Sequence, residues 1–346
     1  MNLKQRIIED IGANGPMPFE RFMHTALYGP DGFFGGGTLR SQKSGDFLTS
    51  PEVSSLFGET LAKYVDHVRQ EIGEPFRLVE VAAGSGSLLR PLLATIDVDA
   101  VTVEVSPAAR RALSDIVGVS DTLPTQIRGV VIANELLDNL PMALAQRIDG
   151  RWRERWVGAE DENLVFVDAE VRDEVRGWLD AYAGPVDEGG WVEVQLEARR
   201  WVSDVLERMI EGSILIIDYG ETAENLRARR RDGTLRTYRA HHLGPHPLDE
   251  PGETDITADV NFTALLDIAP TTTLHRQDHF LASLGLRKRL TDLRKLELDA
   301  ARAGDDMERL RLRTLKTEVE TLMHPRGLGD FRVLEIEVGR NHTQRS

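Results

Sequence analysis

The sequence predicts an α/β fold in which helices cover a mostly parallel sheet, and three observations lead to this prediction. From residue 77 onward, short apolar runs alternate with stretches of helical periodicity. The runs VTVEVS (101–106) and VVIAN (130–134) are rich in β-branched residues, as in strands that are buried on both faces. The β-α-β-α order requires crossover connections between parallel strands. We therefore expect a parallel sheet with helices on both faces.

The N-terminal region is expected to be helical. Residues 1–12 and 17–28 show amphipathic periodicity and are separated by Gly15-Pro16, which breaks a helix. Thr49-Ser50-Pro51-Glu52 has the features of a helix start, namely a hydroxyl N-cap, a proline in the first turn and an early acid. We expect a single helix from this point to about residue 72.

The central and C-terminal regions are expected to supply the sheet. The predicted strands are 77–83, 101–106, 130–134, 213–220 and 331–339, of which the last resembles an edge strand. The predicted helices are 87–96, 107–117, 173–183, 193–211, 277–284 and much of 287–323. Residues 143–171 alternate like antiparallel strands around Asp149-Gly150 and are interpreted as an insertion. Asp255 and Asp259 are interpreted as flanking a helix start, where at least one of them would be a cap.

The composition limits the class of protein. The 346 residues carry 57 acidic and 42 basic side chains, and the net charge of −15 argues against general nucleic-acid binding, which needs a basic surface. The absence of cysteine excludes thiolate metal sites, disulfides and a cysteine nucleophile, and it is compatible with a reducing compartment. Neither a targeting peptide nor an apolar stretch of membrane-spanning length is apparent. We expect a cytoplasmic protein without a membrane span.

A glycine-containing loop follows the first predicted strand of the sheet, in the segment VEVAAGSGS (79–87). Gly84 and Gly86 would let a ligand approach the backbone, and the next helix start offers unpaired N–H groups. A dinucleotide-binding loop has a small residue at the position of Leu89. The strand-end acids Glu80 and Glu104 instead favour an adenosylmethionine site, in which Glu104 accepts both ribose hydroxyls. The alternative is an ordinary tight turn with an exposed acid.

A second polar motif, ANELLDNLP (133–141), follows the apolar strand at 130–134. Ligands of open α/β sheets bind beyond the carboxyl ends of the strands, so Asn134, Glu135 and Asp138 are expected beside the cofactor. If residues 134–138 form a helical turn, the two acids share one face and suit a cationic acceptor such as a guanidinium. In the alternative interpretation, Asp138 caps the next helix and Glu135 pairs with a basic residue of the chain.

Several stretches together resemble the MidA-like methyltransferases, a family that includes the mitochondrial complex I assembly-factor methyltransferase. They are GDFLTSPEVSSLFGE (45–59), ANELLDNLP (133–141), LIIDYG (215–220), GTLRTYRAHH (233–242) and PGETDITADVNF (251–262). The resemblance extends from about Tyr28 to residue 339. It implies a class I methyltransferase, Rossmann-like fold with a seven-stranded sheet, and S-adenosyl-L-methionine as the cofactor. It also implies methylation of a protein arginine, and the family's known target is a subunit of a respiratory complex.

The resemblance further implies roles for individual residues and a division of the chain. The implied cofactor-binding residues are Glu80, Ala82, Gly84, Ser85, Gly86, Glu104, Asp46, Thr49 and Pro51. The implied catalytic residues are Glu135, Asp138, Asn134 and His241, the last from a Y-x-x-H motif. Ala82 stands where the family has glycine. The expected domains are an N-terminal helical cap or lid at 1–74 and a methyltransferase domain at 75–346, with insertions at about 142–192 and 221–262.

Other classes of protein are alternatives. A non-catalytic assembly or scaffolding factor would keep the fold without turnover, and Ala82 is the residue that favours it. A nicotinamide oxidoreductase is disfavoured by Leu89, and the acidic charge disfavours an RNA methylase more than a methylase of a small amine. No metal site is predicted. The residues that could bind a metal lie in a predicted loop and not on a helix, where i,i+4 spacing would place two metal ligands on one face. They are His241, His242, His246 and Asp249.

Overall fold

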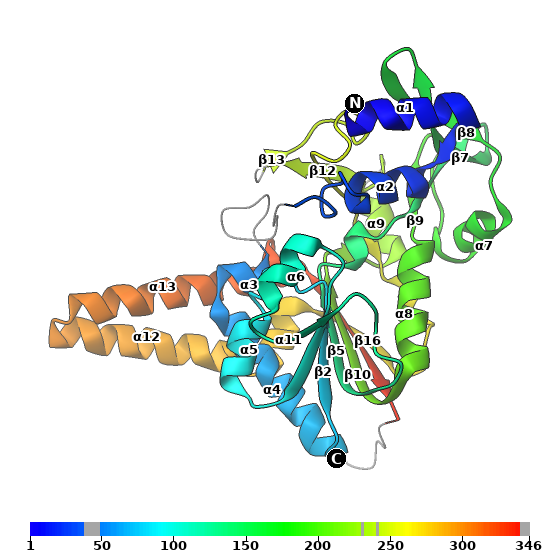
Figure 1. The fold of residues 1–346 in the computed structure, drawn as a ribbon. Helices are drawn as coiled ribbons and strands as arrows, with labels where there is room; N and C mark the ends of the chain where they lie inside the picture. The colour runs from blue at the N-terminus through cyan, green and yellow to red at the C-terminus, as the bar shows by residue number, and fades with distance from the viewer. Residues whose placement is uncertain (38–48, 230–231, 240–241, 340–346) are drawn as a thin grey trace.

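A seven-stranded sheet forms the centre of the molecule (Figure 1). The computed structural model describes residues 1–37, 49–229, 232–239 and 242–339. Across the sheet the order is β16 (Thr272–Arg276), β17 (Arg332–Val338), β10 (Met209–Asp218), β5 (Ile127–Asn134), β2 (Arg77–Val81), β3 (Asp99–Val103) and β4 (Gly118–Ser120). The expected α/β class with a seven-stranded sheet is confirmed.

The five strands from β4 to β10 are parallel, whereas β17 is antiparallel to both of its neighbours. The prediction that residues 331–339 form an edge strand is wrong, because β17 pairs with β10 on one side and with β16 on the other. The edge strand β16 was not predicted, since its sequence TTLHR is short and lacks a buried apolar run. The parallel strands end at one edge of the sheet, so side chains that follow β2, β3 and β5 meet there.

Helices cover both faces of this sheet. On one face, α4 (Ser55–Ile72), α5 (Leu89–Thr95) and α11 (Gln277–Ser283) pack with inward residues of β2, β5 and β10. On the opposite face lie α8 (Leu196–Arg208) and α10 (Thr263–Leu266). The short helix α6 (Pro107–Leu113) lies next to β4. Successive residues of β5 alternate between the two apolar layers, which explains why the strand reads as a continuous apolar run.

Two helices near the C-terminus, α12 (Leu286–Ala303) and α13 (Asp306–Leu322), form an antiparallel hairpin that projects from the body (Figure 1). Gly304, with a φ of 72°, turns the chain between them, and Asp305 caps α13. Leu293, Leu312 and Val319 join the apolar layer of α4. In the described ranges, no helix combines the length and the apolarity that a membrane crossing requires.

A second sheet forms a separate lobe (Figure 1). Its strands are β1 (Met17–Pro18), β7 (Arg151–Glu160), β6 (Ala143–Ile148), β9 (Trp191–Val194) and β8 (Asn163–Ala169), which pairs with β7. The helices α1 (Leu3–Asn14) and α2 (Phe19–Tyr28) pack on this sheet, as does α7 (Asp173–Tyr182). The domain boundary at residue 74 stays a prediction. Segment 1–74 contributes to both lobes, because α4 belongs to the central layer.

The segment between β10 and α10 holds short elements instead of a structureless loop. They are β11 (Gly220–Glu221), α9 (Ala223–Arg229), β12 (Arg236–Arg239), β13 (His242–Leu243), β14 (Asp255–Thr257) and β15 (Val260–Asn261). The predicted helix start at Asp255 and Asp259 is wrong. Asp255 begins a strand and accepts a hydrogen bond from Asn139 at 2.8 Å, and Asp259 pairs with Arg236 at 2.8 Å.

The helix expected from Thr49 to about residue 72 is broken at Ser54. The predicted helix start at Thr49 is confirmed: Thr49 and Glu52 form a capping box that starts α3 (Ser50–Val53). Ser54 then takes an extended conformation, and its hydroxyl accepts the N–H of Leu56 at 3.2 Å to start α4. A serine that bonds the backbone locally can end one helix and cap the next.

Candidate functional site

A cavity lies beyond the carboxyl ends of β2, β3 and β5. It contains about 910 Å³ of empty space, including the part that opens to solvent. Eight of the predicted site residues line it: Thr49, Pro51, Glu80, Ala82, Gly84, Glu104, Asn134 and Glu135. The structure therefore brings together residues from the glycine loop, the acidic motif and the N-terminal segment.

The loop after β2 is built from left-handed backbone positions. Ala82, Gly84 and Gly86 have φ values of 57°, 55° and 78°. The left-handed conformation costs a non-glycine residue roughly 1–2 kcal/mol. The backbone of Ala82, which stands where the family has glycine, is therefore strained. Gly86 does not line the cavity; a Cβ there would lie 2.9 Å from Ile116 and 3.0 Å from Leu113, so glycine allows close packing of the loop.

Ser85 also lies outside the cavity, and its hydroxyl contacts that of Ser87 at 3.2 Å. Asp46 and His241 lie outside the described residues. The cavity lining therefore does not support the implied role of Ser85, and the roles of Asp46 and His241 stay predictions.

Two acids from neighbouring strands define the electrostatics of the cavity floor. Glu80 is 3% exposed, and burial, followed by the charge of Glu104, raises the pKa of its carboxyl to about 8. Its Oε2 has no hydrogen-bond donor among the described residues. Glu104 accepts the backbone N–H groups of Gly84 at 3.1 Å and of Ser106 at 2.8 Å. A ligand that donates hydrogen bonds would satisfy Glu80 and stabilise its charged form.

Glu135 follows β5 in a left-handed conformation with a φ of 52°. The predicted helical turn over 134–138 is therefore absent, and a 3₁₀ turn forms at Leu137–Asn139. The side chain is half-buried in the cavity wall, and Asn134 Nδ2 donates to it at 3.2 Å. Burial, then the charge of Asp138, raises the pKa of Glu135 to about 8. Within the described part of the chain no ion pair to Glu135 forms, so the alternative of a basic partner finds no support.

Asp138 lies behind the cavity wall and is 3% exposed. Its Oδ2 accepts hydrogen bonds from the hydroxyls of Thr257, at 2.6 Å, and Tyr219. It caps no helix. Burial raises the pKa of Asp138, and the two hydroxyl donors oppose this shift. The neighbouring Asp218 accepts the N–H groups of Leu137 and Asp138, and so it anchors the turn.

Three residues of this region, Tyr28, Tyr219 and Arg236, received no catalytic or binding role from the sequence. Tyr28 lines the cavity and donates to the carbonyl of Asn139 at 3.2 Å. Tyr219 contacts Asp138, and the guanidinium carbon of Arg236 lies 4.8 Å from the Tyr219 ring centre. The apolar run LIID before Tyr219 could have indicated a site position for this residue, because a strand there ends at the same edge of the sheet as β2, β3 and β5.

A larger hollow of about 1,930 Å³ adjoins the cavity and shares Tyr28, Glu104 and Leu136 with it. It runs along α2 and α8 and carries both acidic and basic side chains. This volume includes space that opens to solvent, and the hollow extends the cavity towards the second lobe. Among the described residues, no group of three or more His, Asp or Glu side chains could hold a metal ion.

Comparison with known proteins identifies the family. Residues 56–279 match the model of an S-adenosyl-L-methionine-dependent methyltransferase family. The protein arginine methyltransferase NDUFAF7 homologue of Drosophila melanogaster, a mitochondrial protein, is 28% identical over 78% of this chain and 70% of its own length. Human NDUFAF7, also named as a mitochondrial protein arginine methyltransferase, is 26% identical over 85% of this chain and 73% of its own length.

A solved structure agrees with this match. The crystal structure of a Burkholderia thailandensis protein bound to S-adenosylhomocysteine has a TM-score of 0.85 and 28% identity, covering 98% of this chain and 92% of that chain. The chain belongs to the S-adenosyl-L-methionine-dependent methyltransferase family, as the resemblance implied. The expected cytoplasmic location is contradicted, since the curated relatives are named as mitochondrial.

Proposed function

We propose that this member of the S-adenosyl-L-methionine-dependent methyltransferase family methylates a guanidinium nitrogen of arginine in a protein substrate. The curated relatives are named as protein arginine methyltransferases. The observation that carries the proposal is the Glu135 carboxylate, which lies in the wall of the cavity without an ion-pair partner among the described residues. A guanidinium forms planar, bidentate contacts with a carboxylate and would supply the missing positive charge.

The cavity residues fit the cofactor. The unpartnered Oε2 of Glu80 suits a charged ammonium group, and Glu104, already held by Gly84 and Ser106, keeps lone pairs for ribose hydroxyls. Ala82 and Gly84 leave the backbone open to close approach. When bound, adenosylmethionine supplies an electrophilic methyl group on its sulfonium.

The chain's own residues handle the proton of the acceptor. A guanidinium nitrogen that gains a methyl group loses one proton, and a carboxylate at hydrogen-bond distance can accept it. Burial and neighbouring acids raise the pKa of Glu135 toward neutrality, the range in which a general base transfers protons well. Asn134 orients this carboxylate, and Asp138 adds negative charge behind it.

The adjoining hollow supports a polypeptide as the substrate. It shares Tyr28 and Glu104 with the cavity, so residues that flank the acceptor arginine have space beside the reaction site. A small amine would leave this hollow unused.

The test is methyl transfer from radiolabelled adenosylmethionine into arginine-containing peptides and lysate proteins, followed by hydrolysis and identification of the labelled amino acid. We expect label on arginine, and we expect Glu135→Gln to lower the rate by about 100-fold or more, the scale of a lost general base. Glu162→Gln in the β7–β8 turn is the matched control. Label confined to another residue type, or an unchanged rate in Glu135→Gln, contradicts the proposal.

A further inference from the structure

Gln277, at the start of α11, is completely buried although its side chain is polar. Its Nε2 donates to the hydroxyl of Ser50 at 3.1 Å and to the carbonyl of Leu328 at 2.9 Å. Its backbone N–H donates to the carbonyl of Phe331 at 2.8 Å. The side-chain oxygen Oε1 has no donor among the described residues, but the three hydrogen bonds donated by its N–H groups place Gln277 between α3 and the turn before β17.

Ser50, the first residue of α3, connects Gln277 to the candidate site. It is completely buried, and its backbone N–H faces the Glu135 carboxylate and acts to lower the pKa of that group. Thr49 and Pro51 on either side line the same cavity as Glu135. The path from Gln277 to Glu135 therefore passes through Ser50. The side-chain amide of Gln277 holds the Ser50 hydroxyl, and the backbone N–H of Ser50 faces the Glu135 carboxylate.

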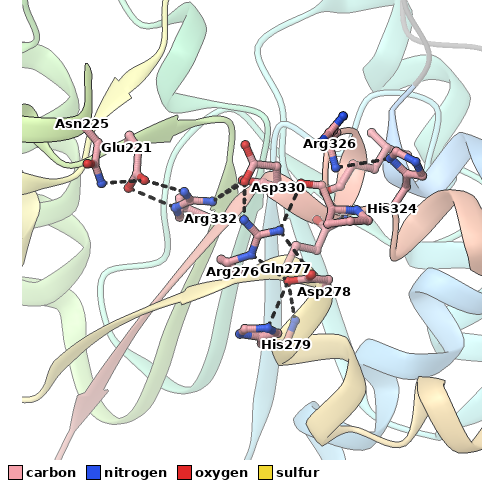
Figure 2. A network of polar contacts seen from close by, with 12 residues as sticks. Glu221, Asn225, Arg276, Gln277, Asp278, His279, His324, Arg326, Asp330 and Arg332 are labelled. Atoms are coloured by element: carbon pink, nitrogen blue, oxygen red, sulfur yellow. Dashed lines mark hydrogen bonds and ion pairs between the residues drawn. The ribbon is translucent and has the colours of Figure 1, made fainter. Parts of the chain in front are cut away.

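An ion-pair network holds the start of α11 in place (Figure 2). Arg276 contacts Asp330 at 2.6 Å and Asp278 at 3.1 Å. Arg332 contacts the same Asp330 and pairs with Glu221 of β11 at 2.6 Å. Figure 2 shows these side chains extending from Glu221 to Asp278, with Gln277 among them. Because Arg332 and Asp278 are buried, water replaces these contacts poorly, and the network fixes α11 against β17.

The surroundings of Glu135 make the Ser50 amide important. Among the described residues, the charged groups whose charge acts on its carboxylate are acids: Asp138 and Asp218 at the sheet edge, and Glu52 on α3. Two donors act against these charges: the Asn134 amide, which donates a hydrogen bond to Glu135 at 3.2 Å, and the Ser50 backbone N–H, which acts to lower the pKa of the carboxyl. Loss of one of the two donors would therefore move the carboxylate and disfavour its ionised form.

We propose that Gln277 is a positioning residue for methyl transfer, which holds the Glu135 carboxylate at the cavity wall through Ser50. This inference rests on the proposed function, because it assigns Glu135 the role of base. Gln277 itself touches neither the cavity nor Glu135, so its effect must pass through α3.

The test compares Gln277→Met, Ser50→Ala and the double variant with the unmodified chain. The titration of Glu135 is followed by ¹³C NMR of protein that carries labelled glutamate. The Glu135 signal is the one that is absent from the spectrum of Glu135→Gln. In parallel, kcat is measured as a function of pH. We expect Gln277→Met to raise the titration midpoint by about one pH unit, the scale of one hydrogen bond to a charged group. The rate at pH 7.5 should fall about three- to tenfold, mainly in kcat. The double variant should shift no further than Gln277→Met alone, because both changes act on one path.

The matched control is Gln146→Met, which removes a side-chain hydrogen bond to the carbonyl of Gly189 in the second lobe. It should leave the midpoint of Glu135 unchanged. If Gln277→Met does not fold, Ser50→Ala carries the test alone. An unchanged midpoint in folded variants, or an equal shift in Gln146→Met, overturns the inference. A shifted midpoint in a chain that never methylates arginine would reject the proposed function and leave the positioning relationship standing.

Discussion

The hydroxyl of Tyr219, at the end of β10, donates a hydrogen bond to the carboxylate of Asp138, which precedes it by 81 residues. Thr257 donates to the same oxygen, whereas Oδ1 has no donor among the described residues. Arg236 lies over the Tyr219 ring and also pairs with Asp259. Asp138 is thus held by Tyr219, just after β10, and by Thr257 of β14, and its charge lies next to Glu135.

Tyr219→Phe tests the contribution of this contact. The variant removes one of two hydroxyl donors to Asp138 and keeps the ring under Arg236. We expect the pKa of Asp138 to rise further and kcat for methyl transfer to fall about tenfold, the scale of one hydrogen bond to a charged group. Tyr182→Phe makes the same chemical change at a contact with Asp267 far from the cavity, and it should leave kcat unchanged. Equal rates in the two variants would exclude a role for the Tyr219 hydroxyl.

Burial of Glu80 should make the stability of the fold depend on pH. Its pKa is raised to about 8 in the folded chain, so between about pH 4.5 and 8 the folded state binds a proton that the unfolded state has released. The free energy of unfolding should therefore fall as pH rises through this window. Denaturant titrations without cofactor should show Glu80→Gln to be more stable than the unmodified chain by about 1–2 kcal/mol at pH 7.5, with little difference at pH 5.

The same variant should bind the cofactor less well. Glutamine cannot supply the negative charge that Glu80 offers to an ammonium group, so we expect a loss of about 10- to 100-fold in affinity for S-adenosylhomocysteine by calorimetry. Full affinity in Glu80→Gln would show that the carboxylate does not contact the cofactor.

Ala82→Gly tests whether the glycine loop stores strain. Ala82 has a φ of 57°, and glycine adopts this conformation without the cost of a Cβ. After allowance for the greater freedom of glycine in the unfolded chain, we expect a gain of about 0.5–1 kcal/mol in the free energy of unfolding. Ala83→Gly, at a neighbouring position without a positive φ, should instead destabilise the chain. A loss in both variants would contradict strain at Ala82.

Arg172 should be critical for the second lobe. Its guanidinium pairs with Glu154, which is completely buried in β7, and with Glu20 of α2. Arg172→Met would leave Glu154 buried without its cation, so we expect a loss of about 3–5 kcal/mol in the free energy of unfolding. Arg153→Met removes an exposed pair with Glu170 and should cost less than about 1 kcal/mol. Similar losses in the two variants would mean that burial of Glu154 does not set the cost.

Much of the fold could be predicted because its signals are local. The order of strands and helices, the capping box at Thr49 and Glu52, and the acids Glu80 and Glu104 at strand ends all follow from short stretches of sequence. Parallel strands end at one edge, so the prediction that these acids line one site with Glu135 needed no knowledge of distant contacts.

Predictions failed where the decisive partners are distant in sequence or the local signal is weak. The edge strand β16 has no apolar run, and Ser54 breaks a helix that periodicity alone would continue. Glu135 adopts a left-handed conformation instead of a helical turn, so it and Asp138 do not share a helix face.

The sequence alone thus determined the class of fold, the glycine-containing loop after β2 and the acids at the sheet edge, since periodicity, glycine spacing and strand-end position are properties of neighbouring residues. The tertiary structure decided which of those acids faces the cavity and which is buried behind it, and it placed Tyr219 and Arg236 beside Asp138. The reason is that burial and hydrogen-bond partners arise from segments far apart in the chain, and these contacts set the pKa and orientation of a carboxylate.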